Sequence, residues 1–192
     1  MNDSFFLTEV ENALRVLNKD GVILYPTDTI WGLGCDATNE KAVERIYRIK
    51  QRQDSKSVII LVADESEVLK YVAAPDPSVF DLVKEQDKPT TVIFENAIGL
   101  PDKLISDDGT IAIRIVKDEF CRHLIKRLRK PIVSTSANIS GQNYPGSFAT
   151  ISDNIKSRVD YIVKWRQEEA NPSQPSRIIK VNPNGGLTIL RD

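Results

Sequence analysis

The densest group of hydrogen-bonding side chains follows an apolar strand that we predict over residues 131–134. It contains four hydroxyls and one amide, from Ser134, Thr135, Ser136, Ser140 and Asn138. A connecting loop needs turn-forming residues, but seldom so many donors and acceptors in succession. Because α/β proteins bind ligands where strands end, we interpret this segment as a ligand site.

A second polar segment, YPTDTIWGLG, spans residues 25–34 after another predicted strand. Thr27 and Thr29 supply hydroxyls, and Asp28 supplies a carboxylate. Asp28 has an alternative role, because aspartate side chains often close a turn with their own backbone. The spacing of Gly32 and Gly34 is more typical of a tight turn than of a phosphate-binding loop. The segment therefore indicates either a small polar ligand site or a structured turn.

Three cations gather at the end of a helix predicted over residues 42–50: Lys50, Arg52 and Lys56. They could bind phosphates. They could equally complement the negative end of the helix dipole, which is worth roughly 0.3–1 kcal/mol for each charge. A second basic cluster, at residues 122–130, suits phosphates too, although a solvated helix face explains it as well.

Several catalytic patterns are missing from the sequence. It has no GxxxxGK[ST], GxGxxG, HExxH or GxSxG pattern. Cys35 and Cys121 have no CxxC spacing, which excludes a cysteine-built zinc site and fits a reducing compartment. We expect Cys35 to be a buried thiol and the single histidine, His123, to have a packing or surface role. No metal ligand is predicted.

The composition is that of an ordinary globular protein of 192 residues, with 41% hydrophobic and 28% charged residues. The longest apolar run covers residues 58–63 and is far too short to cross a bilayer. The start of the chain does not resemble a secretion signal, so we expect a cytoplasmic protein with no membrane partner. The formal net charge is −1, which makes the basic clusters local features.

Helical and strand patterns alternate along the chain and favour a mixed α/β sheet within one domain, residues 1–192. A capping box at Thr8 predicts a first helix that ends near Asp20. Further helices are predicted at 42–50, from 64, from 77 and at 118–129, the last capped by Asp118. Strands are predicted at 22–25, 57–62, 90–94, 110–116, 131–134, 161–165, 176–181 and 187–190. Residues 26–36 are predicted to form a loop.

Three motifs occur together: YPTDTIWGLG at 25–34, KQR at 50–52 and STSANISG at 134–141. The combination resembles the YrdC family of threonylcarbamoyl-AMP synthases, and the similarity runs from Gly21 to Arg191. The resemblance implies a twisted mixed β-sheet with flanking helices around a large, positively charged cavity.

The reaction implied by the resemblance is a nucleotidyl transfer. L-threonine, bicarbonate and ATP give threonylcarbamoyl-AMP and pyrophosphate, and a downstream tRNA threonylcarbamoyl transferase uses the product to modify an adenosine of tRNA. The resemblance also implies Mg²⁺ bound with ATP. A carbamate must attack the α-phosphorus of ATP, so the site needs positive charge more than a covalent nucleophile.

The resemblance also implies the site residues. Those implied in catalysis are Lys50, Arg52, Ser136 and Asn138. Those implied in ATP binding are Lys50, Arg52, Lys56, Thr110, Ser136, Asn138, Tyr144 and Arg191. Those implied in threonine binding are Thr29, Arg114, Ser134 and Ser176. Period-two alternation places Thr110 and Arg114 on one strand face, and the arginine fork suits a carboxylate. Without the resemblance, Arg114 would indicate only a salt bridge on an edge strand.

The chain departs from the family pattern at a few positions. Gln53 replaces a frequent proline, Ser57 replaces a second one, and Leu61 stands where some members have histidine. Arg177 occupies the middle of a motif that usually reads Ser-Thr-Ile. These departures bear on the shape of the predicted threonine pocket.

Two alternatives belong to other functional classes. The first is a noncatalytic protein that binds double-stranded RNA or tRNA through its basic cavity. The aromatic content of 7% and the net charge of −1 argue against a dedicated RNA binder. The second is a carbamoyl-transfer role like that of larger hydrogenase-maturation proteins, which contain a similar domain and additional ones.

Overall fold

The computed structural model describes residues 3–51, 58–169, 174–181 and 187–192. Within these residues the helices are α1 (Asp3–Leu17), α2 (Glu40–Lys50), α3 (Glu65–Val68), α4 (Ser78–Lys84), α5 (Glu119–Leu128) and α6 (Asp153–Lys156). Two 3₁₀ turns are η1 (Asp102–Leu104) and η2 (Phe148–Thr150). The strands are β1 (Ile23–Tyr25), β2 (Gly32–Gly34), β3 (Ile59–Val62), β4 (Thr90–Phe94), β5 (Ile111–Ile115), β6 (Ile132–Ser136), β7 (Tyr161–Ile162), β8 (Arg177–Val181) and β9 (Leu187–Arg191).

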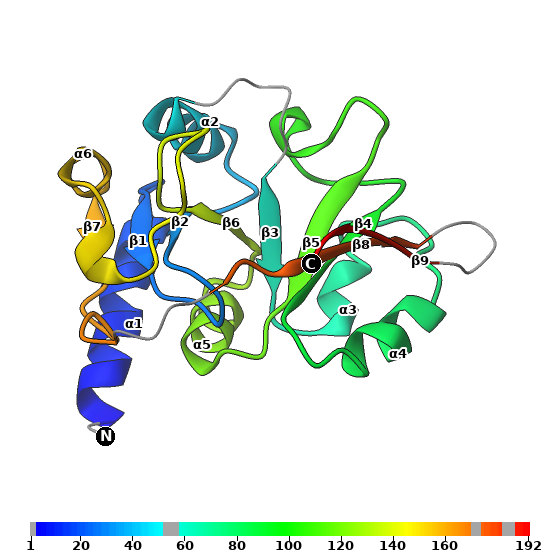
Figure 1. Ribbon diagram of the computed structural model, residues 1–192, viewed down its shortest axis with the longest axis horizontal. Coiled ribbons are helices and arrows are strands. Elements are labelled where there is room, and N and C mark those ends of the chain that lie inside the picture. The colour runs from blue at the N-terminus through cyan, green and yellow to red at the C-terminus, as the bar shows by residue number, and fades with distance from the viewer. Residues whose placement is uncertain (1–2, 52–57, 170–173, 182–186) are drawn as a thin grey trace.

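The strands form one sheet in the order β7-β1-β2-β6-β3-β5-β4-β8-β9. Figure 1 shows this sheet running across the molecule, from β7 and β1 at one side to β8 and β9 at the other. β3 is parallel to β5 and antiparallel to β6, so the sheet is mixed, as predicted. Ile59 lies opposite both Ala112 and Ser134, which places residues of β5, β3 and β6 in one row.

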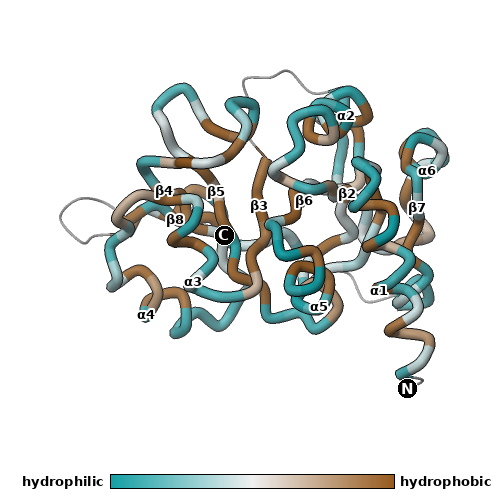
Figure 2. The backbone as a smooth tube through the Cα atoms, turned by 180° about the vertical axis from the view of Figure 1, so that it is seen from behind, coloured by the Kyte–Doolittle hydropathy of each residue, from teal (hydrophilic) through white to brown (hydrophobic). Residues whose placement is uncertain are grey.

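Two hydrophobic cores lie on the two faces of the sheet, because successive strand residues point in opposite directions. Leu24, Ile60 and Val133 belong to the first core, together with residues of α2, α3 and α4. Leu61 and Ile132 belong to the second core, together with residues of α1 and α5. Figure 2 shows the apolar strands β3 and β6 between these helices, whose outer turns are hydrophilic.

The second face of the sheet is covered by helices over only part of its width. α1 and α5 pack on each other and contact β1, β7 and β3. Ala112 of β5, Ile93 of β4 and Ile178 of β8 belong to neither core. This half of the sheet face therefore lies open beside α5, and it is where a cavity forms.

Capping residues mark the ends of helices α2 and α5. The Asn39 side chain accepts a hydrogen bond from the Ala42 amide at the start of α2. α2 ends at Gln51, which adopts a left-handed conformation with φ 49°. At α5, Asp118 accepts from the Cys121 amide, which confirms the predicted cap.

Two local predictions are wrong. The first helix begins at Asp3 rather than at a capping box, and the Thr8 hydroxyl donates within the helix to the Ser4 carbonyl. The predicted loop 26–36 contains strand β2, which pairs antiparallel with β1 on one side and β6 on the other. The residues of β2 have no strand preference of their own, so the two neighbours impose the extended conformation.

Gly34 is required because the Tyr25 ring crosses directly over its backbone. A Cβ atom at position 34 would lie 2.6 Å from Tyr25 Cε1 and 3.0 Å from the Val133 carbonyl oxygen. Tyr25 is itself fully buried, and burial raises its pKa well above the ordinary value. Gly34 therefore allows close packing of the strands. The prediction of a tight turn at Gly32 and Gly34 is wrong, because both glycines belong to strand β2.

None of the helices in the described ranges combines the length and the apolar character that a membrane span requires.

Gly34→Ala is expected to destabilise the fold by about 1–3 kcal/mol, because the new methyl group overlaps Tyr25 and the β6 backbone. Gly146→Ala is the matched control, since a Cβ there meets no atom within 4 Å. Urea denaturation of both variants measures the difference. Equal midpoints for the two variants would show that Tyr25 moves aside without a penalty.

Candidate active site

A cavity of about 340 Å³ occupies the part of the second sheet face that α1 and α5 leave open. Ala112 and Arg114 of β5, Ile59 of β3 and Ile93 of β4 form its floor. The polar residues that line it are Thr29, Arg114, Ser134, Thr135, Ser136, Tyr144, Ser176 and Arg191. The cavity thus joins two of the segments selected from the sequence, 25–34 and 134–141, with the start of β8 and the end of β9.

Arg114 is the most deeply buried charge in the cavity, with only 2% of its side chain exposed. Its Nη1 donates to Thr29 Oγ1 at 3.0 Å, and its Nη2 lies 3.2 Å from Asp28 Oδ1. That ion pair lacks hydrogen-bond geometry, since Asp28 Oδ1 and Arg114 Nε are both buried without a hydrogen-bond partner in the described structure. Nε is therefore the guanidinium nitrogen that lacks a hydrogen-bond partner here, while the neighbouring Nη2 has only the ion pair with Asp28.

Thr29 is oriented by a second threonine. Thr27 Oγ1 accepts from the Thr29 amide at 3.0 Å and donates to the Ile30 carbonyl at 2.8 Å. Because Thr27 has only one hydroxyl proton, the 2.9 Å contact between the two hydroxyls must be a donation from Thr29 to Thr27. Thr29 Oγ1 thus donates a hydrogen bond to Thr27 Oγ1 and accepts one from Arg114 Nη1. Toward a ligand it can act only as an acceptor.

Ser176 and Arg191 form the opposite wall of the cavity. Arg191 Nε and Nη2 donate to the Ser176 carbonyl at 3.0 and 2.8 Å. The Ser176 hydroxyl lies 2.8 Å from that of Thr91, which is fully buried on β4. These bonds tie the start of β8 to the end of β9, and they fix the distance between Arg191 and the floor.

The charge of the lining is one-sided. Arg114 and Arg191 contribute two positive charges, and none of the described lining residues is a carboxylate. The pKa of Arg191 is lowered, first by burial and then by the positive charge of Arg114. Since two like charges in one cavity destabilise each other, an anion bound between them would relieve that repulsion. The arrangement favours an anionic ligand.

Lys50 supports the cavity from behind. Its side chain is 1% exposed, and Nζ donates to the carbonyl oxygens of Ser136 at 2.5 Å and Asn138 at 2.8 Å. The Asn138 side chain continues this framework by donating to the Gln142 carbonyl at 2.6 Å. Neither Lys50 nor Asn138 lines the cavity. Their contacts hold the loop that presents the Ser136 hydroxyl.

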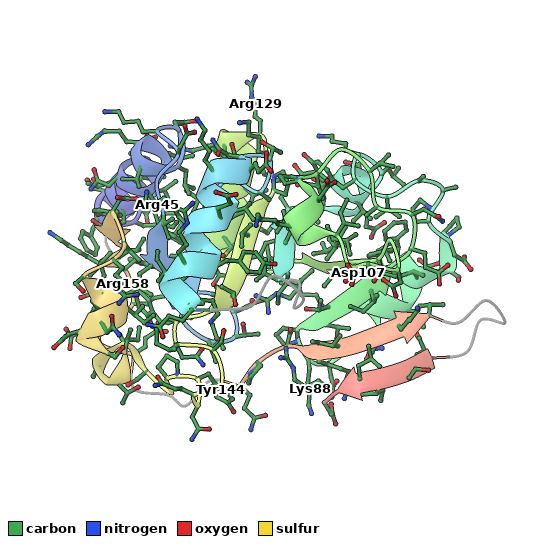
Figure 3. The ribbon with its side chains drawn as sticks, turned by 90° about the horizontal axis from the view of Figure 1, so that it is seen from above. Arg45, Lys88, Asp107, Arg129, Tyr144 and Arg158 are labelled. Carbon is green, nitrogen blue, oxygen red and sulfur yellow. The ribbon has the colours of Figure 1, made fainter. Side chains whose placement is uncertain are left out.

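The other predicted residues are placed as follows. Tyr144 lines the rim and is 44% exposed. Thr110 does not line the cavity, and its hydroxyl donates to Asp108. Arg52 and Lys56 lie outside the described residues, as do Gln53 and Ser57. Arg129 of the second basic cluster lies at the far edge of the molecule from Tyr144 (Figure 3).

Two departures from the family pattern do not line the cavity. Leu61 is fully buried in the second core, beside Arg114 in the strand register. Arg177 bonds Asp192 and Gln86, while its neighbours Ser176 and Ile178 line the cavity. The predictions for Cys35 and His123 are confirmed. Cys35 is fully buried, which raises its pKa, and His123 packs edge-on against Phe6 at 5.3 Å.

Several residues that line or support the cavity were not predicted from the sequence to do so. Thr91 positions Ser176, and the apolar lining of Ile93, Ala112 and Ile178 gives no polar signal. Asp28 pairs with Arg114, whereas the turn at this point is closed by the Thr27 hydroxyl. Ala112 lies on the face of the strand 110–116 that period-two alternation predicts for Arg114.

The donor set does not make a protein cage for Mg²⁺. Mg²⁺ usually takes one or two carboxylates in addition to phosphate and water oxygens. The described lining offers hydroxyl and carbonyl oxygens, and the described residues contain no cluster of three His, Cys, Asp or Glu side chains suited to a metal.

A mixed-sheet α/β protein with a cationic, hydroxyl-lined cavity is the class that this fold and site define. A family model described as "Telomere recombination", and named for Sua5, YciO and YrdC, matches residues 15–192. The chain belongs to this Sua5/YciO/YrdC family, which confirms the resemblance seen in the motifs.

Three similar proteins illustrate the relationship. The threonylcarbamoyl-AMP synthase of Idiomarina loihiensis is 35% identical over 164 residues, covering 84% of this chain and 87% of that protein. The crystal structure of E. coli YciO is 27% identical with a TM-score of 0.81, and the match covers 95% of this chain and 88% of YciO. Sua5 of P. abyssi, solved with L-threonine, shares the fold at 23% identity and a TM-score of 0.82. The match covers 95% of this chain but only 53% of that Sua5 chain.

Lys50→Met should lower the free energy of unfolding by about 1–3 kcal/mol, because the buried Ser136 and Asn138 carbonyls would lose a charged donor. Lys84→Met is the control, since Lys84 pairs with Glu65 on the surface. Its denaturation midpoint should stay nearly unchanged. If Lys50→Met is as stable as the control, the loop does not depend on Lys50.

Proposed function

We propose that this chain is a threonylcarbamoyl-AMP synthase, converting L-threonine, bicarbonate and ATP to threonylcarbamoyl-AMP and pyrophosphate. The observation that carries the proposal is the buried Arg114, whose Nε has no hydrogen-bond partner in the described structure, at a cavity whose described lining contains no carboxylate. The names of the curated relatives support the reaction, and the threonine bound in a protein of the same fold supports the amino acid.

The chemistry matches the charge of the cavity. The threonine amine and bicarbonate combine with loss of water to a carbamate, and a carbamate oxygen attacks the α-phosphorus of ATP while pyrophosphate leaves. This step brings two anions together. Positive charge and fixed donors therefore supply the main stabilisation, and no covalent nucleophile is required.

On this proposal the cavity has a threonine side and a nucleotide side. The threonine carboxylate binds the Nε–Nη2 edge of Arg114. Thr29, which can only accept, receives a hydrogen bond from the amino group or the hydroxyl of threonine, and Ser134 and Ser176 complete the pocket. Ser136, Tyr144 and Arg191 face ATP, with Lys50 and Asn138 holding the Ser136 loop. Contacts of Lys50, Arg52, Lys56, Thr110 and Asn138 with ATP stay predictions, as do the catalytic roles of Lys50, Arg52, Ser136 and Asn138.

Mg²⁺ would reach the site on ATP, with phosphate and water oxygens as its main ligands. We further propose that the protein acts in the cytoplasm, where it would supply its product to a tRNA threonylcarbamoyl transferase. The product is a mixed anhydride, so a transferase acting directly after this enzyme would limit its loss to hydrolysis.

The reaction is tested by measuring pyrophosphate release from ATP and bicarbonate, with and without L-threonine. The proposal predicts release that requires all three substrates and yields one threonylcarbamoyl-AMP for each pyrophosphate. L-serine should react ten- to two-hundredfold more slowly, since one missing methyl group is worth roughly 1–3 kcal/mol. Pyrophosphate release that does not depend on threonine would contradict the proposal.

Arg114→Lys should weaken threonine binding about ten- to hundredfold, because lysine keeps the charge but cannot form two parallel hydrogen bonds. ATP affinity should change far less. Calorimetric titration of each ligand measures both effects. Arg177→Lys is the matched control, because Arg177 bonds Asp192 and Gln86 instead of lining the cavity. Loss of ATP affinity with threonine affinity intact would move Arg114 to the nucleotide side.

A further inference from the structure

Arg166 stands in a conformation that its side chain must stabilise. It follows β7 and has φ 64°, in the left-handed region that residues other than glycine, asparagine and aspartate rarely adopt. Such outliers persist where surrounding contacts hold them, and they point to a role. The side chain of Arg166 is 25% exposed and contacts two separate segments, at Thr27 and Asp118, as well as its near neighbour Glu169.

Those contacts use all three guanidinium nitrogens. Nη1 donates to Asp118 Oδ2 at 2.7 Å, and Nε donates to Glu169 Oε2 at 2.8 Å. Nη2 donates to the Thr27 carbonyl at 3.2 Å. Asp118 is the cap of α5, so it is anchored by its other oxygen on the Cys121 amide. Arg166 thereby ties the loop of Thr27 to the start of a core helix.

Further hydrogen bonds connect the Thr27 loop to Arg114 on the floor of the cavity. The Thr27 hydroxyl accepts from the Thr29 hydroxyl, and Thr29 in turn accepts from Arg114 Nη1 at 3.0 Å. Hydrogen bonds therefore run from Asp118 through Arg166 to the Thr27 carbonyl, and from the Thr27 hydroxyl through Thr29 to Arg114, joined by the covalent atoms of Thr27. A shift of the Thr27 backbone would move the acceptor that orients the guanidinium.

The Thr27–Thr29 loop also lacks close packing on one side. A second cavity, of about 170 Å³, lies behind it and is lined by Thr27, Thr29, Trp31 and Arg166. Thr29 lines both cavities and so forms part of the wall between them. Where packed atoms do not support a loop, its hydrogen bonds determine its position. Arg166, which donates to the Thr27 carbonyl, also lines this cavity.

We propose that Arg166 is a positioning residue for the threonine pocket, holding Thr29 and through it the Arg114 guanidinium in the geometry that binds the amino acid. The effect on threonine rests on the proposed function. The effect on the loop does not, because it concerns only contacts within the chain.

The test uses Arg166→Met in the full chain, with Arg45→Met as the matched control. Arg45 also forms a two-bond ion pair, with Asp160 at 2.7 and 3.1 Å, and it does not line the cavity. Hydrogen exchange should become faster in residues 27–31 of Arg166→Met and stay unchanged there in Arg45→Met. In steady-state kinetics, Arg166→Met should raise KM for threonine about tenfold and KM for ATP less than about twofold.

A double variant separates positioning from general stability. In a Thr29→Val background the route to Arg114 is already broken, so adding Arg166→Met should raise KM for threonine little further. Equal rises in both KM values, full additivity with Thr29→Val, or unchanged exchange in residues 27–31 would each overturn the proposal. A wild-type protein with no threonine-dependent activity would overturn the synthase assignment and with it the effect on threonine, while the exchange result would still decide whether Arg166 holds the loop.

Discussion

The site depends on one buried guanidinium. Taking a charged group out of water is unfavourable unless partners replace the lost hydration. Arg114 has partners for only part of its donor set: a hydrogen bond to Thr29 and an ion pair with Asp28 that lacks hydrogen-bond geometry. Its Nε is buried without a partner in the described structure. The protein therefore holds a cation whose remaining donors are available to an anionic ligand.

The rest of the fold can be understood as the means of placing that cation. α1 and α5 cover one half of the second sheet face and leave β5, β4 and β8 open beside them. Arg114 points into this open half because period-two alternation puts Ile113 and Ile115 on the other face, against the first core. A covered sheet would need an apolar residue at this position, and a fully open one would let water screen the charge.

Several features of the fold could be predicted from sequence because their causes are local. The Asp118 cap, the alternation of helices and strands and the polar loop after β6 depend on residues a few positions apart. β2 was missed because its strand conformation comes from β1 and β6, and because Gly34 is needed for the approach of Tyr25. The Thr8 capping box failed because the helix continues past it to Asp3.

For the site, the motifs selected Thr29, Ser134 and Ser136, and the family resemblance added Arg114, Ser176 and Arg191; all six line one cavity. The roles of Asp28 and Arg166 could not be predicted in this way. Arg166 and Thr27 are 139 positions apart, and nothing in the residues around either one indicates the bond. Lys50 was predicted as an ATP ligand, and that contact stays a prediction; its support of the loop carbonyls behind the cavity was not foreseen.

A crystal structure of the protein with L-threonine would show directly whether the carboxylate of the amino acid binds Arg114. We expect the two carboxylate oxygens to lie about 2.7–2.9 Å from Arg114 Nε and Nη2, with Thr29 still bonded to Nη1. Threonine bound with its carboxylate on Arg191 or elsewhere, and Arg114 Nε still unpaired, would contradict it.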